Sequence, residues 1–168
     1  DPQAAVMLLE RTLQLRWDDH LAAETAVAYL RLKRPHEALS TLRRLNGAAG
    51  KSSFALGLEG EAHAQLGEQR IAQDLWRESL EFRGSRAAHE RLAETEPRPE
   101  QARRHQARAL YFAAIERLEA GEVEETARLF EASLELDPSQ SDARYLLGEA
   151  RREQGHADAA PLTRCRHQ

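Results

Sequence analysis

Residue types that could perform acid–base, nucleophilic or metal chemistry are present, but not in the spacing that such chemistry needs. The seven histidines are spread through the chain without an HExxH motif, and a single cysteine excludes a CxxC motif. The nearest approach to a metal-ligand set is His156, Cys165 and His167, which a frayed terminal helix explains better. Adjacent carboxylates such as Glu124 and Glu125 begin an expected helix, where they favour the helix dipole and face water. We therefore expect no catalytic residue, no metal and no cofactor, and a protein that is not an enzyme.

The composition indicates a helical protein with a highly charged surface. The 168 residues are 41% hydrophobic, only 5% aromatic and 31% charged, which suits helices rich in Ala, Leu, Glu and Arg. The net charge is −4 and the signs alternate along the chain, so no basic face for nucleic acid is expected. No apolar stretch reaches the roughly 20 residues that would span a bilayer, so no membrane insertion is expected. We expect a soluble protein whose location, cytoplasmic or periplasmic, stays open, because one cysteine forms no internal disulfide.

The hydrophobic pattern predicts helices throughout. Apolar residues recur at the helical spacing of three and four, and no segment alternates as a strand would, so the predicted fold class is all-α. Short turns between the helices predict antiparallel neighbours, that is, a row of helical hairpins. The expected helices cover residues 3–15, 19–33, 35–46, 52–66, 69–82, 85–95, 100–119, 122–136, 141–154 and 157–165.

The chain repeats with a period of 34 residues. Gly121 and Gly155 are 34 residues apart, and each lies between two expected helices. Ala38 and Ala72 have the same separation, and Gly67 occupies the turn of its own copy. The copies begin at residues 19, 53, 107 and 141, with 20 extra residues between the second and the third. Left-handed glycines at positions 67, 121 and 155 would end the first helix of their copies.

This period resembles that of the tetratricopeptide repeat family. In the copy from residue 107, the matching residues are Leu110, Ala114, Arg117, Gly121, Thr126, Phe130, Ser133 and Pro138. In the copy from residue 53, they are Leu56, Gly60, His63, Gly67, Ala72, Trp76, Ser79 and Gly84. The copy from residue 19 departs from the pattern, because Lys33 stands where the turn glycine is expected.

The resemblance implies a right-handed α-solenoid of antiparallel helix-turn-helix repeats forming one domain over residues 1–168. A break or an extra helix is expected near residues 85–100, because Pro97 and Pro99 interrupt the pattern. The implied parts are a half repeat or cap at 1–18, repeats at 19–52 and 53–86, an insert at 87–106, a repeat at 107–140 and a partial repeat at 141–168.

The same resemblance implies a concave groove lined by the first helix of each repeat. The residues expected to bind a partner there are Phe54, Leu58, Glu61, Arg108, Tyr111, Phe112, Ile115, Tyr145 and Glu149. The alternative interpretation is that Tyr111, Phe112 and Ile115 belong to the core, covered by the insert helix or a neighbouring repeat. A clamp for the carboxylate tail of a chaperone is not expected, because only Arg108 is basic among the matching positions.

We therefore expect a noncatalytic interaction module of a larger, bacterial protein. It would bind a peptide or a helix of a partner protein in its groove, within a multiprotein assembly. One alternative is self-association, in which the open repeat ends stack between copies and form a homo-oligomer. Another is that the chain recruits substrates for an enzyme whose catalytic domain lies elsewhere in a longer chain.

Overall fold

The structure is a computed structural model that describes the backbone of residues 2–49, 52–82 and 84–164, with side chains from residue 3 to residue 155 apart from 46–51 and 83. Nine helices account for this part of the chain, and it contains no strand, which confirms the all-α prediction. The helices are α1 (Pro2–Leu15), α2 (Asp19–Arg31), α3 (Pro35–Ala49), α4 (Ser53–Gln65), α5 (Gln69–Phe82), α6 (Arg86–Thr95), α7 (Pro99–Glu119), α8 (Val123–Leu136) and α9 (Ser141–Arg164).

The predicted turn at Gly155 is wrong. Residues 141–154 and 157–165 were expected as two helices, but α9 runs without interruption from Ser141 to Arg164. Gly155 does not have the positive φ of a turn glycine, and a Cβ at this position would meet no atom within 4 Å. A glycine inside a helix costs only about 1 kcal/mol relative to alanine, so it does not end a helix by itself.

Three hairpins, α2–α3, α4–α5 and α7–α8, share one turn geometry. Lys33, Gly67 and Gly121 follow the first helix with φ of 57°, 80° and 76°. In each turn, the N–H of this residue donates to the carbonyl three residues earlier, and the next N–H donates to the carbonyl five residues earlier, at 2.9–3.1 Å. These bonds define a Schellman motif, which satisfies the last carbonyls of the helix. The left-handed glycines predicted at 67 and 121 are confirmed, and Lys33 adopts the same conformation without being glycine.

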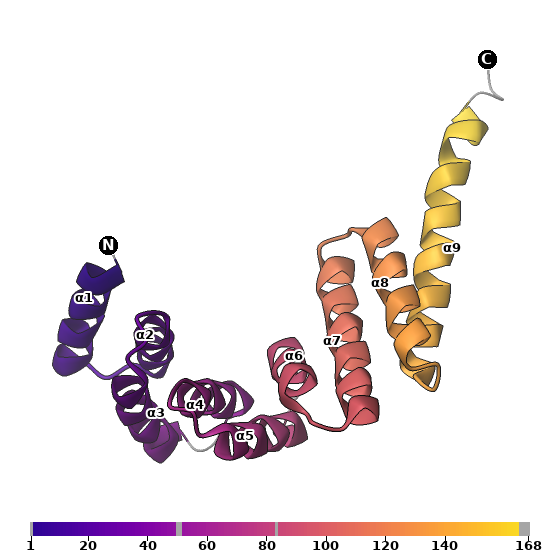
Figure 1. Cartoon of the computed structure of the whole chain (residues 1–168). Helices are drawn as coiled ribbons and strands as arrows, with labels where there is room; N and C mark the ends of the chain where they lie inside the picture. The colour runs from indigo at the N-terminus through magenta and orange to yellow at the C-terminus, as the bar shows by residue number, and fades with distance from the viewer. Residues whose placement is uncertain (1, 50–51, 83, 165–168) are drawn as a thin grey trace. The chain divides into compact units, whose positions relative to one another are not determined.

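The chain contacts divide the protein into two compact units, Asp1–Thr95 and Glu96–Gln168. In the first unit, successive helices from α1 to α6 pack against one another (Figure 1). Val6 and Leu13 of α1 are buried against α2, where the Tyr29 hydroxyl donates a hydrogen bond to Glu10. Burial and this carboxylate raise the pKa of Tyr29 to about 12, so its hydroxyl keeps its proton and remains a donor.

The helix expected at residues 85–95 is α6, and it packs on the side of α5 that carries Trp76. Ala88 and Leu92 of α6 form a buried cluster with Ala72 and Trp76 of α5. The amide of Gln73 donates to the carbonyl of Thr95 at 2.6 Å, which joins the two helices at the end of α6. Residues 86–95 therefore complete the core of the first unit.

Gly60 is required where α4 approaches Trp76. A Cβ at Gly60 would lie 2.4 Å from the indole Nε1 and 2.6 Å from its Cδ1, and the indole is fully enclosed. Gly60→Ala should therefore destabilise the protein by about 1–3 kcal/mol through overpacking. Chemical denaturation followed by circular dichroism measures the change. Gly57→Ala on the same helix is the matched control, because a Cβ there meets nothing within 4 Å; equal losses for both variants would contradict the assignment.

The second unit contains α7, α8 and α9, which pack in sequence (Figure 1). Its core consists of Ala114 of α7, Ala127 and Phe130 of α8, and Ala143, Leu147 and Ala150 of α9. Ser133 is also fully buried, and its hydroxyl donates to the carbonyl of Ala107 at 2.8 Å. Small residues at the crossing of α7 and α8 let the two backbones approach, as the sequence predicts.

Candidate functional site

An apolar groove of about 590 Å³ lies in the first unit. Its walls come from α2, α4 and α6, and Trp76 of α5 contributes to its lining. The lining residues are Val27, Leu30, Arg31, Lys33, Ser53, Phe54, Gly57, Leu58, Glu61, Gln65, Trp76, Ser85, Ala87, Ala88 and Arg91. A volume of this size is in the range that holds a small ligand or a few side chains of a partner.

The groove contains an exposed aromatic side chain and lies against the hydrophobic core of the first unit. Phe54 is 58% exposed, although a phenylalanine of a folded domain usually contributes to a core. Leu58, one turn further along α4, is half-buried and packs against the main cluster of the first unit. Three residues predicted to bind a partner, Phe54, Leu58 and Glu61, therefore lie along one groove wall.

Charged residues lie along the same groove. Arg91 of α6 pairs with Glu61 at 3.0 Å and with Glu94 at 3.1 Å. Burial lowers the pKa of Arg91, but these two carboxylates outweigh it and hold the pKa above its ordinary value. Arg31 and Lys33 are exposed and make no ion pair within the described residues. The groove thus has two cations available to a ligand.

Gln65 presents an unsatisfied acceptor between α2 and α4. Its amide nitrogen donates to the carbonyl of Leu30 at 3.1 Å, which fixes the orientation of the amide. Its Oε1 is, among the buried side-chain nitrogen and oxygen atoms of the described residues, the one without a hydrogen-bond partner. A buried acceptor left unpaired costs about 1–3 kcal/mol, so an N–H donor entering the groove would gain by reaching it.

The remaining six predicted residues lie in the second unit, where Tyr111 and Ile115 contribute to packing. Both are partly buried against the core of that unit. The Tyr111 ring lies edge-on to Phe112, with centroids 5.3 Å apart, and 5.7 Å from Phe130. Burial raises the pKa of Tyr111 above its ordinary value. Tyr111 therefore packs against Phe130 in the core of the second unit and is also partly exposed on α7.

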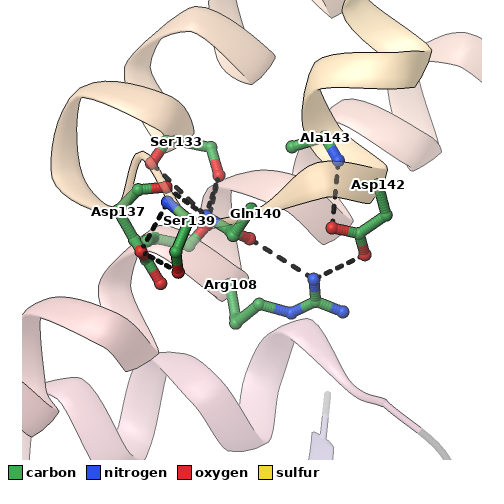
Figure 2. Close-up of polar contacts among 8 residues, drawn as sticks. Arg108, Ser133, Asp137, Ser139, Gln140, Asp142 and Ala143 are labelled. Atoms are coloured by element: carbon green, nitrogen blue, oxygen red, sulfur yellow. Dashed lines mark hydrogen bonds and ion pairs between the residues drawn. The ribbon is translucent and has the colours of Figure 1, made fainter.

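Arg108 is engaged within its own unit (Figure 2). Its Nη1 donates to Asp142 at 2.7 Å and to Gln140 at 3.3 Å, which joins α7 to the start of α9. The guanidinium lies over the rings of Tyr111 and Phe112, at 4.3 and 5.4 Å from their centroids. Burial raises the pKa of Asp142, but the hydrogen bond and the charge of Arg108, together with backbone N–H groups at the start of α9, outweigh burial and hold the pKa below its ordinary value. A partner's carboxylate would have to compete with Asp142 for Arg108.

Figure 2 also shows a polar network at the turn between α8 and α9 that the sequence pattern did not reveal. Gln140 is buried, and its amide donates to the Ser133 hydroxyl at 2.9 Å. Asp137 accepts bonds from both the N–H and the hydroxyl of Ser139. Ser133 was interpreted as a small packing residue, but its hydroxyl also joins Ala107 of α7 to Gln140 of the turn, and the bond to α7 depends on how the two helices pack.

The other two predicted residues lie on α9. Tyr145 is 66% exposed, and Glu149 accepts a hydrogen bond from Arg152 on the same helix. Of the nine predicted residues, three thus belong to the first unit and six to the second. The side chains of His156, Cys165 and His167 lie outside the described residues, and the described part holds no cluster of three metal-binding side chains. None of the helices within that part is both long and apolar enough to cross a membrane.

In its described residues, this protein belongs to the all-α class, with hairpins of similar turn geometry and an apolar groove. No protein-family model matches the sequence, and no curated protein matches it.

Proposed function

We propose that the chain is a noncatalytic scaffold module, a tetratricopeptide-like α-solenoid that binds a peptide or a helix of a partner protein. The observation that carries the proposal is the groove of about 590 Å³ in the first unit. The first helices of two successive hairpins, α2 and α4, line it together with α6. Grooves of this kind bind partner segments through apolar anchors.

The solenoid assignment is supported by the recurrence of the same contacts at a fixed spacing. Asp18 caps α2 and Ser52 caps α4, each accepting from the N–H three residues on, and these residues are 34 apart. Lys33 and Gly67 are 34 apart in the two Schellman turns. Both ends of the first helix thus repeat with the period that the sequence predicts for one structural repeat.

Partner binding is supported by features of the groove that the fold alone does not require. More than half of the surface of Phe54 is exposed to water, and an apolar side chain of a partner that covers this surface would stabilise the complex. Gln65 has a buried oxygen without a partner, which the N–H of a bound segment would satisfy. The predicted surface on α7 and α9 of the second unit, around Phe112 and Tyr145, is a second candidate for contact with the same or another partner.

The second candidate function is self-association, which the exposed face of α1 favours. Met7, Leu8 and Leu15 are 67%, 68% and 83% exposed on one short helix. Another copy of the chain could cover this face by stacking. Molecular mass measured over a range of protein concentrations distinguishes this function, because a monomer at every concentration argues against it.

Phe54→Ser tests the proposed function. Loss of a central aromatic anchor should weaken partner binding about tenfold or more and leave the melting temperature nearly unchanged, because the side chain is exposed. The immobilised protein is used to capture partners from an extract of the source cells, and captured proteins are quantified by mass spectrometry. Phe82→Ser is the matched control, since Phe82 is also 58% exposed but does not line the groove. Equal capture by both variants would contradict the proposal.

A further inference from the structure

Lys33 occupies a backbone conformation that favours glycine. Its φ is 57°, in the left-handed region, and the equivalent residues of the next hairpins are Gly67 and Gly121. The left-handed conformation is unfavourable for a residue with a side chain, because its Cβ comes too close to the following carbonyl oxygen. Strain of this kind is common where a side chain serves a function, which points to a role for the side chain of Lys33 beyond closing the turn.

Lys33 lies where the groove meets a smaller recess. It lines the groove together with Arg31, and it also lines an adjoining recess of about 270 Å³ that reaches Glu94. The groove and the recess are lined by three cations and two carboxylates. The carboxylates, Glu61 and Glu94, are both paired with Arg91, which leaves Arg31 and Lys33 without an acidic partner among the described residues. Arg31 and Lys33 thus leave positive charge at this end of the groove, on a chain whose net charge is −4.

We propose that the segment bound in the groove is apolar and acidic, and that Lys33 and Arg31 bind a side-chain carboxylate of that segment. This inference rests on the proposed function, because it names the chemistry of the partner. The apolar residues of the segment cover Phe54 and Leu58, and an N–H of the segment donates to Gln65 Oε1. The carboxylate forms ion pairs with Arg31, at the C-terminal end of α2, and with Lys33, in the turn that follows.

The charges and the lining favour a polypeptide over a nucleic acid. Binding a phosphate backbone requires several cations in a row, and the groove offers two unpaired ones between apolar walls. The cations also argue against a basic segment, because a lysine or arginine of the partner would be placed beside them. The preference is therefore for a segment with one or two carboxylates next to large apolar residues.

Selection from a random peptide library displayed on phage tests the inference. Selection on the wild-type protein should enrich peptides with Asp or Glu beside large apolar residues. Selection on the double variant that combines Lys33→Gln and Arg31→Gln should enrich peptides without this acidic preference. The strongest enriched peptide, labelled with fluorescein, then serves as the probe in fluorescence anisotropy. Lys33→Gly should bind it about three- to tenfold more weakly at low salt, with a smaller difference at high salt.

The same variant separates a functional lysine from a structural one. Lys33→Gly should raise the melting temperature, because glycine relieves the left-handed strain, while it weakens peptide binding. A lysine that served only the turn would give the higher melting temperature with unchanged or tighter binding, which would overturn the inference. Arg43→Gln is the matched control, since Arg43 is exposed on α3 and does not line the groove.

The outcomes distinguish failure of the inference from failure of the proposed function. Enriched peptides that bind through Phe54 but show no acidic preference would overturn the inference and leave the proposed function standing. Recovery of no peptide, or of peptides that bind Phe54→Ser as well as wild type, would overturn both. Displacement of the selected peptide by a single-stranded oligonucleotide would overturn the choice of an acidic polypeptide.

Discussion

Trp76→Ala should lower the free energy of unfolding by about 3–5 kcal/mol, the range for removing a large aromatic from a core. Trp76 is 2% exposed and packs with Ala72 of its own helix and with Ala88 and Leu92 of α6. Its indole N–H donates to the carbonyl of Gly57 at 3.3 Å. The alanine variant leaves a cavity where α4, α5 and α6 meet, and it removes the indole N–H that donates to Gly57.

Urea denaturation followed by circular dichroism measures this loss, because the substitution removes one of the two tryptophans that would report by fluorescence. Phe82→Ala on the same helix is the control, and a surface substitution of this kind should cost less than about 1 kcal/mol. A loss below about 1 kcal/mol for Trp76→Ala would contradict the packing of α6 on α5. The combination with Gly60→Ala should be less than additive, because a smaller residue at 76 removes the clash.

Phe130→Ala should have an effect of the same size, about 3–5 kcal/mol, in the second unit. Phe130 is fully buried and packs with Ala114 of α7 and Leu147 of α9. The Tyr111 ring, 5.7 Å from that of Phe130, loses its neighbour when the phenyl group is removed. The cavity would therefore weaken the contacts of α8 with both helices that flank it in the sequence.

Hydrogen exchange locates this second effect along the chain. Faster exchange should begin in α7, α8 and α9, because the buried cluster around Phe130 consists of residues from these helices. Tyr145→Ala is the control aromatic, since Tyr145 of α9 is 66% exposed and should cost less than about 1 kcal/mol. Uniform protection in the Phe130 variant, with unchanged stability, would show that the cluster does not hold these helices together.

Trp76 and Phe130 occupy equivalent places in their hairpins, 54 residues apart, which is one period of 34 plus the 20 extra residues. Each is on the second helix of a hairpin and packs against the helix that follows it, α6 or α9. Their positions could be predicted because a large residue at a fixed distance from the turn must fill the space that small residues leave. The turn glycines Gly67 and Gly121 were also predictable, because this helix-ending turn needs a positive φ, which glycine adopts without steric cost.

The sequence by itself determined what depends on local periodicity. Helical spacing of apolar residues, short turns and the 34-residue recurrence predicted an all-α chain of antiparallel hairpins, and the helix bounds follow closely except at Gly155. At Gly155 a local signal was misleading, because the cost of one glycine is smaller than the gain of a continuous helix. Phe54, Leu58 and Glu61 were expected in a groove only through the resemblance of the repeat period to a known family; they line the groove of the first unit, and their binding of a partner stays a prediction.

Only the tertiary structure decided how residues distant in sequence combine. It placed α6 on Trp76, paired Arg108 with Asp142, and left Gln65 Oε1 without a donor. It also showed that Lys33 takes a glycine-like conformation beside the groove. These features depend on contacts between separate helices, and the free energy of such contacts is set by packing and desolvation, for which a local sequence pattern carries no signal.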